Sequence, residues 1–310
     1  MIYQKIALLD NREDVTLTSY VLDDSTEILA GKPRAAILIC PGGAYLGCSD
    51  REAEPIAMAF AAMGYHAFVL HYSVYIGGTG FPDLSKPFTP NGNSQFPNQL
   101  RELGKAILYI RSKANEWLVD VNKIVICGFS AGGHNCAMYS VYWNKPLMTD
   151  YLGVNADILR PAACILCYPL TDYFLTSNNS LIDPRTNGLI RLANTALTGS
   201  ENPSDELMQQ LSPARLVDAN TPPTFLWTTR EDNLLPVAHT TAMAHALAIN
   251  NIPFELHIFE KGVHGLSLAT SATAGDKSGL DADASKWIGL CNEWLKKRFE
   301  PDVPEVKYNW

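Results

Sequence analysis

Short, mostly apolar runs alternate with longer helix-like segments along this chain, and the alternation constrains the fold more than any other feature. Most of these runs lack the polar residue at every second position that a sheet with one wet face would show. Strands that are buried on both faces and separated by helices are typical of parallel sheets. The sequence therefore predicts an α/β fold with a mostly parallel central sheet, with strands at residues 35–40, 65–71, 123–127, 164–168, 224–228 and 254–259.

An antiparallel strand pair, at residues 4–9 and 15–21, is expected to precede this sheet. The clearest helix spans about 98–117, where apolar residues recur at alternating steps of three and four. We expect further helices at 51–63, 236–250 and 284–299. Helices in these connections would flank the sheet on both faces. The stripe of the clearest helix consists of Leu100, Leu103, Ile107, Ile110, Ala114 and Trp117.

Two irregular segments, about 73–97 and 171–222, leave from the ends of predicted strands. We interpret both as loop or cap-like excursions of a single domain that spans residues 1–310. A long loop within a compact domain is usually functional or disordered. Aromatic side chains of the first excursion could line an entrance or pack the loop against the body, and the sequence leaves both options open: Tyr75, Phe81, Phe88 and Phe96.

The formal net charge of −8 and the pI of about 5.4 argue against nucleic acid as a partner, because an acidic surface repels phosphate backbones. No apolar stretch is long enough to span a bilayer, and the first residues lack the pattern of a signal peptide. We therefore expect a cytoplasmic protein without a membrane partner. The sequence leaves open whether the chain forms a homodimer.

The seven cysteines are odd in number, and most stand in apolar runs rather than in loops. Cys164 and Cys167 form a CxxC pattern, but they lie inside the apolar run 162–168. Two thiols within a buried strand are the better interpretation than a redox pair, and no second CxxC completes a metal site. We therefore expect neither a disulfide framework nor a bound metal.

The motif Gly128-Phe129-Ser130-Ala131-Gly132 directly follows the apolar run 123–127 and precedes a helical pattern. A serine hydroxyl becomes a useful nucleophile when its oxygen is exposed and a base can take its proton. A sharp strand-to-helix turn exposes the oxygen, and flanking glycines permit the crowded backbone. The motif alone would also fit an ordinary glycine-rich turn, but its position between strand and helix favours Ser130 as a nucleophile.

The base is expected late in the chain, because the chain order in proteins with this elbow is serine, acid, histidine. His264 stands in the glycine-flanked stretch 262–265, just after the predicted strand 254–259, where a loop can place an imidazole over Ser130. The other histidines lie in predicted strands (His66, His71, His257) or in helical segments (His134, His239, His245).

Asp232 is the expected acid, since it follows the predicted strand 224–228 and precedes His264. Such a carboxylate orients the histidine and stabilises its charged form. Glu231 and Asp172 are competitors for this role. A helix cap near Pro236 is the structural alternative for Asp232.

Pro41-Gly42-Gly43-Ala44-Tyr45 follows an early predicted strand, which is where the oxyanion loop of such enzymes belongs. Attack on an ester produces a negative oxygen that preplaced backbone N–H groups stabilise. We expect Gly43, Ala44 and Ala131 to supply these groups, although an ordinary glycine turn would have the same sequence.

Taken together, the motifs PGGAY, GFSAGGH, TREDNLLPVAHT and GVHG resemble the acetyl-xylan-esterase-like and feruloyl-esterase-like branch of the α/β-hydrolases. The chain is also similar to the hormone-sensitive-lipase-like esterases. The resemblance covers about residues 35–298 and implies an α/β-hydrolase fold, with Ser130, Asp232 and His264 as the catalytic triad. Pro41 replaces the histidine that many esterases carry, and Ala44 replaces their third glycine, which weakens the similarity to the hormone-sensitive-lipase-like branch.

The predicted function is that of a serine carboxylesterase which hydrolyses short-chain acyl esters through an acyl-enzyme, without metal or organic cofactor. A small-molecule or oligosaccharide ester is the expected substrate, and the preference for acetyl groups on a sugar rests on the resemblance alone. A peptidase or amidase of the same fold is one alternative. A catalytically silent binding protein on a hydrolase scaffold is the other, although such proteins usually lack a triad residue.

Overall fold

A computed structural model describes residues 1–28, 30–77, 80–177 and 184–299 of the chain. The last residues of the predicted 1–310 domain, 300–310, lie outside the described residues. The same holds for residues 78–79 and 178–183, which belong to the two predicted excursions.

Eight strands in the described residues form one sheet in the order β1-β2-β4-β3-β5-β6-β7-β8. The two opening strands pair antiparallel with each other, β2 pairs antiparallel with β4, and all other neighbours are parallel. The predicted fold class and the antiparallel N-terminal pair are thereby confirmed. The strands are β1 (Ile2–Leu9), β2 (Arg12–Val21), β3 (Arg34–Cys40), β4 (His66–His71), β5 (Val119–Phe129), β6 (Ala163–Cys167), β7 (Thr224–Thr229) and β8 (Phe254–Phe259).

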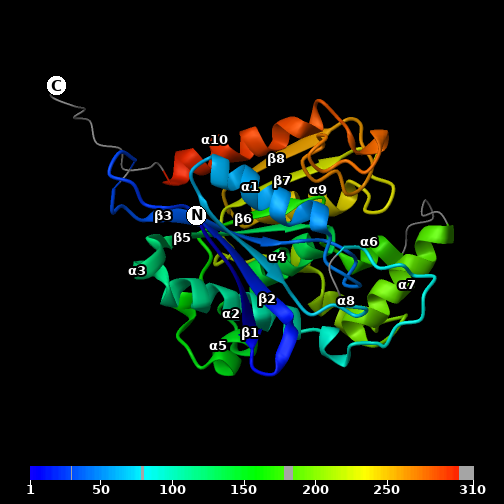
Figure 1. Ribbon diagram of the computed structural model, residues 1–310. Coiled ribbons are helices and arrows are strands. Elements are labelled where there is room, and N and C mark those ends of the chain that lie inside the picture. The colour runs from blue at the N-terminus through cyan, green and yellow to red at the C-terminus, as the bar shows by residue number, and fades with distance from the viewer. Residues whose placement is uncertain (29, 78–79, 178–183, 300–310) are drawn as a thin grey trace.

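Helices cover both faces of the sheet (Figure 1). One face carries α1 (Glu54–Ala62) and α10 (Trp287–Phe299), whereas α2 (Asn98–Ser112), α4 (Ser130–Tyr142) and α9 (Ala238–Ile249) pack on the other. The remaining helices are α3 (Ala114–Trp117), α5 (Pro146–Leu152), α6 (Tyr173–Ser177), α7 (Pro184–Thr198) and α8 (Asp205–Gln210), with short 3₁₀ turns η1 (Asp50–Glu52), η2 (Gly92–Ser94), η3 (Ala156–Leu159), η4 (Pro213–Arg215), η5 (Lys277–Gly279) and η6 (Ala284–Lys286).

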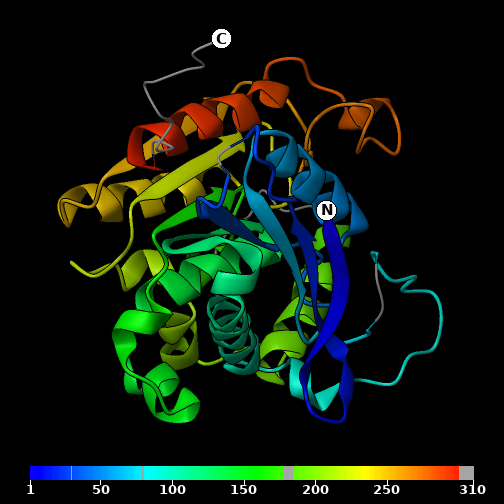
Figure 2. The same cartoon turned by 60° about the vertical axis from the view of Figure 1, so that its left-hand side comes forward.

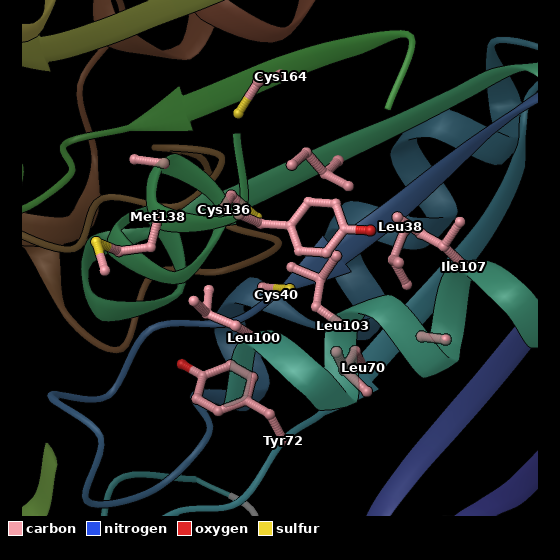
Figure 3. Close-up of a cluster of buried hydrophobic side chains, with 14 of the residues drawn as sticks. Leu38, Cys40, Leu70, Tyr72, Leu100, Leu103, Ile107, Cys136, Met138 and Cys164 are labelled. Carbon is pink, nitrogen blue, oxygen red and sulfur yellow. The ribbon is translucent and has the colours of Figure 1, made fainter. Parts of the chain in front are cut away.

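The central strands are buried on both faces because successive side chains point to opposite sides of a strand. In β3, Ile37 and Ile39 face the cluster under α1 and α10, whereas Leu38 and Cys40 face the cluster under α2 and α4. Figure 3 shows part of the second cluster, where Leu100, Leu103 and Ile107 of α2 meet Leu38, Cys40 and Leu70 of the sheet. All seven cysteines are buried and free, and Cys164 and Cys167 lie in the buried strand β6, as the apolar context of their CxxC pattern predicted.

The predicted helix 98–117 is two helices, α2 and α3, separated at Lys113. The backbone of Lys113 has φ −99° and ψ 3°, and the short helix after it places Trp117 on the ring of Phe68, with centroids 5.5 Å apart. Leu118 then adopts φ 51° and turns the chain into β5. The apolar stripe continues through the break, so periodicity alone cannot reveal it.

Other predicted boundaries also shift. The helix expected at 51–63 is η1 followed by α1, and that expected at 236–250 begins at Ala238. The one expected at 284–299 opens as the 3₁₀ turn η6 before α10. The helix α5 had no sequence-based prediction.

In the residues that the structure describes, the two segments predicted as excursions contain no strand of the sheet. In its described residues, the first holds the short turn η2, and it stands out beside the β1–β2 pair as a cyan loop in Figure 2. Tyr75 and Phe96 of this excursion pack against the core, whereas Phe81 and Phe88 are exposed. The second holds α6, α7, α8 and η4. Among the helices of the described ranges, none combines the length and the apolar composition that crossing a bilayer requires.

Candidate active site

Ser130 is the first residue of α4, directly after β5, at a sharp strand-to-helix turn. Its φ of 51° is strained for a residue other than glycine. A Cβ at Gly128 would lie 2.1 Å from the carbonyl oxygen of Gly132, and a Cβ at Gly132 would lie 2.0 Å from that of Cys40. Only glycine fits at both positions, so the tight turn that presents the Ser130 hydroxyl depends on them.

His264 lies in the loop after β8 and forms hydrogen bonds on both sides of its ring. Its Nε2 is 2.8 Å from the Oγ of Ser130, and its Nδ1 is 2.7 Å from the Oδ2 of Asp232. The other oxygen of Asp232, Oδ1, accepts the N–H groups of Leu234 and Leu235 at 3.0 and 2.8 Å. The structure thus brings the three predicted residues into one hydrogen-bonded row, and the carboxylate also caps the turn that leads to α9.

The pKa of His264 lies above its usual value as a balance of opposing effects. Burial lowers the pKa, but the charge and the hydrogen bond of Asp232 raise it by more, and Glu52 adds to the increase. The positive charge of Arg51 opposes this increase. The site therefore favours the imidazolium that forms when His264 accepts a proton.

In the described residues, the carboxylate that binds His264 is that of Asp232 rather than that of either competitor. Glu231 is exposed, whereas Asp172 is bound by Arg215 at 2.8 Å and by the N–H of Phe174. Among the other histidines, His134 is buried in α4 and bonded to the Tyr45 hydroxyl and the Leu211 carbonyl, and burial lowers its pKa to about 4. The rest lie in the predicted kinds of element: His66 and His71 in β4, His257 in β8, and His239 and His245 in α9.

The predicted oxyanion donors lie at two neighbouring turns, after β3 and at the start of α4. Ala44 and Ala131 line the same cavity as Ser130, whereas Gly43 is not among the residues that line it. Within the described part of the chain, the N–H groups of Gly43, Ala44 and Ala131 have no protein acceptor. These donors are therefore available to a ligand. Gly43 and Ala44 adopt φ of 132° and 55°, so the loop turns sharply.

The cavity beside Ser130 has a volume of about 60 Å³ and is lined mainly by apolar side chains. Residues of α6 and α7, in the second excursion, form one of its walls. Leu189 and Ile190 of α7 belong to this wall. Of the loop aromatics of the first excursion, none lines this cavity, so the entrance role left open above has no support there.

Sequence reasoning missed three residues around the histidine loop: Arg51, Glu52 and Tyr168. Glu52 and Tyr168 are 4% and 2% exposed, and the Tyr168 hydroxyl donates to the Glu52 carboxylate. Arg51 donates to the carbonyl groups of Gly265 and Thr273. The sequence hints at this role only through the charged pair Arg51-Glu52, which follows the oxyanion loop. Such a pair is also common at the start of an exposed helix.

Comparison with known proteins finds a matching family, sequence relatives and similar solved structures. Residues 30–247 match the BD-FAE family. Endo-1,4-beta-xylanase B from Butyrivibrio fibrisolvens is 34% identical over 242 residues, which is 76% of this chain but 33% of that protein. An acetylxylan esterase from Xylanibacter ruminicola is 26% identical over 82% of this chain and 45% of its own length. The chain thus spans a third to a half of the length of these relatives.

Solved structures match over nearly the whole chain. A carboxylesterase from Lactobacillus plantarum superposes with a TM-score of 0.78 at 27% identity, over 98% of this chain and 100% of that one. An acetyl ester-xyloside bifunctional hydrolase from Caldicellulosiruptor lactoaceticus gives a TM-score of 0.70 at 28% identity, over 95% and 96% of the two chains. These matches confirm the predicted resemblance and the predicted fold.

Proposed function

Because this chain belongs to the BD-FAE family of α/β-hydrolases, we propose that it is a serine carboxylesterase in which Ser130 is the nucleophile, His264 the base and Asp232 the acid. The observation that carries this proposal is the continuous row from Asp232 through His264 to Ser130, with hydrogen bonds of 2.7 and 2.8 Å. Esterases and carboxylesterases among the relatives and structural neighbours support the same reaction class.

In the proposed mechanism, His264 takes the proton of Ser130 while the serine oxygen attacks the ester carbonyl. The negative oxygen that forms would be stabilised by the free N–H groups of Gly43, Ala44 and Ala131. His264 then gives its proton to the departing alcohol, leaving an acyl group on Ser130. A water molecule, activated by the same histidine, releases the acid and restores the hydroxyl.

The small cavity beside Ser130 supports a short acyl group. Its volume of about 60 Å³ exceeds that of a single water site but is far below that of a drug-sized pocket, which is usually ~300 Å³ or more. Its apolar wall suits the methyl of an acetyl group. Names of similar proteins, an acetylxylan esterase and an acetyl ester-xyloside hydrolase, favour an acetylated carbohydrate as the substrate.

Labelling with a fluorophosphonate tests the nucleophile. We expect Ser130 to be modified and the S130A variant to remain unlabelled. The proposal would be refuted if the folded wild-type protein resisted a reagent concentration that labels a control esterase.

A series of nitrophenyl esters, together with acetylated xylo-oligosaccharides, tests the acyl group. We expect kcat/KM to be highest for acetate and to fall roughly tenfold or more for each methylene that the cavity cannot hold. Ile190→Ala widens the wall and should improve butyrate relative to acetate. Ile249→Ala, at a position 66% exposed in α9, is the matched control and should leave the ratio unchanged. A maximum at long acyl chains would contradict this assignment.

Nitroanilide substrates separate the esterase from the peptidase or amidase alternative, because an amidase would cleave both classes. A cytoplasmic location stays a prediction from the sequence.

A further inference from the structure

A buried carboxylate connects the two loops on which the proposed reaction depends. Glu52 lies in η1, directly after the oxyanion loop, and is 4% exposed. Its Oε2 accepts the N–H of Gly42 at 2.7 Å, and its Oε1 accepts the hydroxyl of Tyr168 at 2.7 Å. The Tyr168 hydroxyl in turn accepts the N–H of Ser267 at 2.9 Å, three residues beyond His264. A chain of hydrogen bonds thus runs from Gly42 to Ser267 through one carboxylate.

The same 3₁₀ turn holds the histidine loop at further points. Arg51 donates to the carbonyl oxygens of Gly265 and Thr273, and its own carbonyl accepts the hydroxyl of Ser267. Ser267 is completely buried, so these contacts fix the part of the loop that follows His264. Arg51 therefore contacts the loop directly, through its side chain and its backbone, whereas Glu52 reaches it through Tyr168.

Tyr168 is placed for this bridge at the expense of backbone strain. It follows β6 with a φ of 37°, which is unfavourable for an aromatic residue, and its N–H is held by the carbonyl of Trp227 at 2.7 Å. In this conformation its ring lies edge-on to the imidazole of His264, with centroids 5.1 Å apart and an angle of 71° between the planes. The strained residue therefore supports the base on one side and binds Glu52 on the other.

We propose that Glu52 is a positioning residue of the esterase site: its carboxylate, bound to Gly42 and Tyr168, holds the oxyanion loop and the histidine loop in register and directs a negative charge at His264. This inference rests on the function proposed above. Burial raises the pKa of the Glu52 carboxyl, but the hydrogen bonds that its two oxygens accept from Gly42 and Tyr168 oppose this rise and favour the ionised form. Its charge would favour the imidazolium that develops as Ser130 attacks.

The effect of Glu52 on the pKa of His264 can be measured separately from that of the other charged groups around the ring. Asp232 and Glu52 favour the protonated ring, whereas Arg51 opposes it. His239 also faces the site, but burial lowers its pKa to about 4, so it is neutral near pH 7. Removing the charge of Glu52 should therefore shift the acidic limb of the kcat/KM profile to lower pH, because His264 would lose its proton more readily.

The experiment compares Glu52→Gln, Tyr168→Phe and the control Glu54→Gln, which alters an exposed glutamate two residues further along the chain. We expect E52Q to lower kcat by roughly 10²-fold through misplaced reacting groups, with a smaller change in KM. Its acidic limb should move to lower pH. Y168F keeps the carboxylate, so it should lower kcat while moving the limb less. E54Q should match the wild type in both measurements.

Glu52→Asp supplies the rescue arm, because it restores the charge with a shorter reach. We expect the position of the acidic limb to recover more than kcat does. The proposal would be overturned if E52Q and Y168F, normalised to fluorophosphonate-labelled sites, stayed within about twofold of the wild type. It would equally fail if E52Q lost activity with an unmoved acidic limb. If E52Q does not fold, the kcat of Y168F alone tests whether the hydrogen-bond chain through Glu52 and Tyr168 supports the reaction. A wild-type protein that neither labels nor hydrolyses esters would refute the proposed function instead.

Discussion

Replacing Asp232 by Asn should inactivate the protein almost without changing its shape. The Oδ1 of Asp232 already accepts the N–H groups of Leu234 and Leu235, so the oxygen of an asparagine would stay there. The amide NH₂ would then face the Nδ1 of His264, 2.7 Å from the atom that it replaces. Since an NH₂ group can only donate, the imidazole would have to carry its proton on Nε2. That nitrogen could no longer accept the proton of Ser130.

The expected loss follows from this forced tautomer. Exchanging the acid of a serine triad for its amide lowers kcat by ~10⁴, which corresponds to about 5 kcal/mol of barrier. The assay is nitrophenyl acetate hydrolysis near pH 7, with kcat expressed per folded molecule and the melting temperature measured alongside. Because the two backbone hydrogen bonds survive, the melting temperature should change little.

Asp172→Asn is the matched control for this variant. Asp172 is also buried and also binds a backbone N–H, that of Phe174, but its charged partner is Arg215 rather than His264. We expect D172N to lower stability and to leave kcat within a few-fold of the wild type. A D232N variant that kept more than a tenth of the wild-type kcat would refute the reasoning, as would a D172N variant with the larger loss.

Three further outcomes follow from the structure. The raised pKa of His264 predicts that kcat/KM rises with pH through a midpoint above the ordinary value of about 6.5, because only the neutral ring accepts a proton; a midpoint below it in the wild-type pH profile would contradict this. Gly132→Ala would place a Cβ 2.0 Å from the Cys40 carbonyl, so we expect a lower melting temperature and lost fluorophosphonate labelling, and a normally labelled variant would contradict the elbow geometry. Burial raises the pKa of Glu102 from its ordinary value of 4.5 to about 7. Its contribution to the free energy of unfolding is therefore present at low pH and is lost, by about 3 kcal/mol, as the pH rises between these two values. Glu102→Gln should remove this pH dependence in urea titrations, and an unchanged dependence would assign it to other groups.

The sheet could be predicted well because each central strand is buried on both faces and so forms a short apolar run. β3 and β7 illustrate this, since their predicted and observed ranges nearly coincide. β5 is longer than predicted, because its first residues, from Val119, include polar side chains at the edge of the run. The break at Lys113 could not be predicted, since the apolar stripe passes through it and the turn is fixed by packing of Trp117 on Phe68.

The three residues of the proposed triad could be predicted because local geometry restricts their neighbours. Gly128 and Gly132 are required by contacts of about 2 Å with backbone atoms, so the nucleophile turn leaves a pattern in the sequence. Asp232 and His264 follow strands whose ends meet at one edge of the sheet. Both residues could therefore be identified from their positions after predicted strands, and the alternation of strands and helices in the sequence gives those positions.

Glu52 leaves no comparable pattern, because what gives it a role is supplied by distant parts of the chain. Its partner Tyr168 follows β6, and the group that Tyr168 binds, Ser267, lies in the loop after β8. Each contact alone has an ordinary explanation. A carboxylate often accepts a backbone N–H of a turn, a buried tyrosine hydroxyl needs an acceptor, and a loop N–H needs one as well. An isolated buried carboxylate is strongly unfavourable and would become protonated or move to solvent, so the charge of Glu52 depends on these partners. That Glu52 is nonetheless buried beside the base is the physical reason to assign its charge to the reaction rather than to the surface.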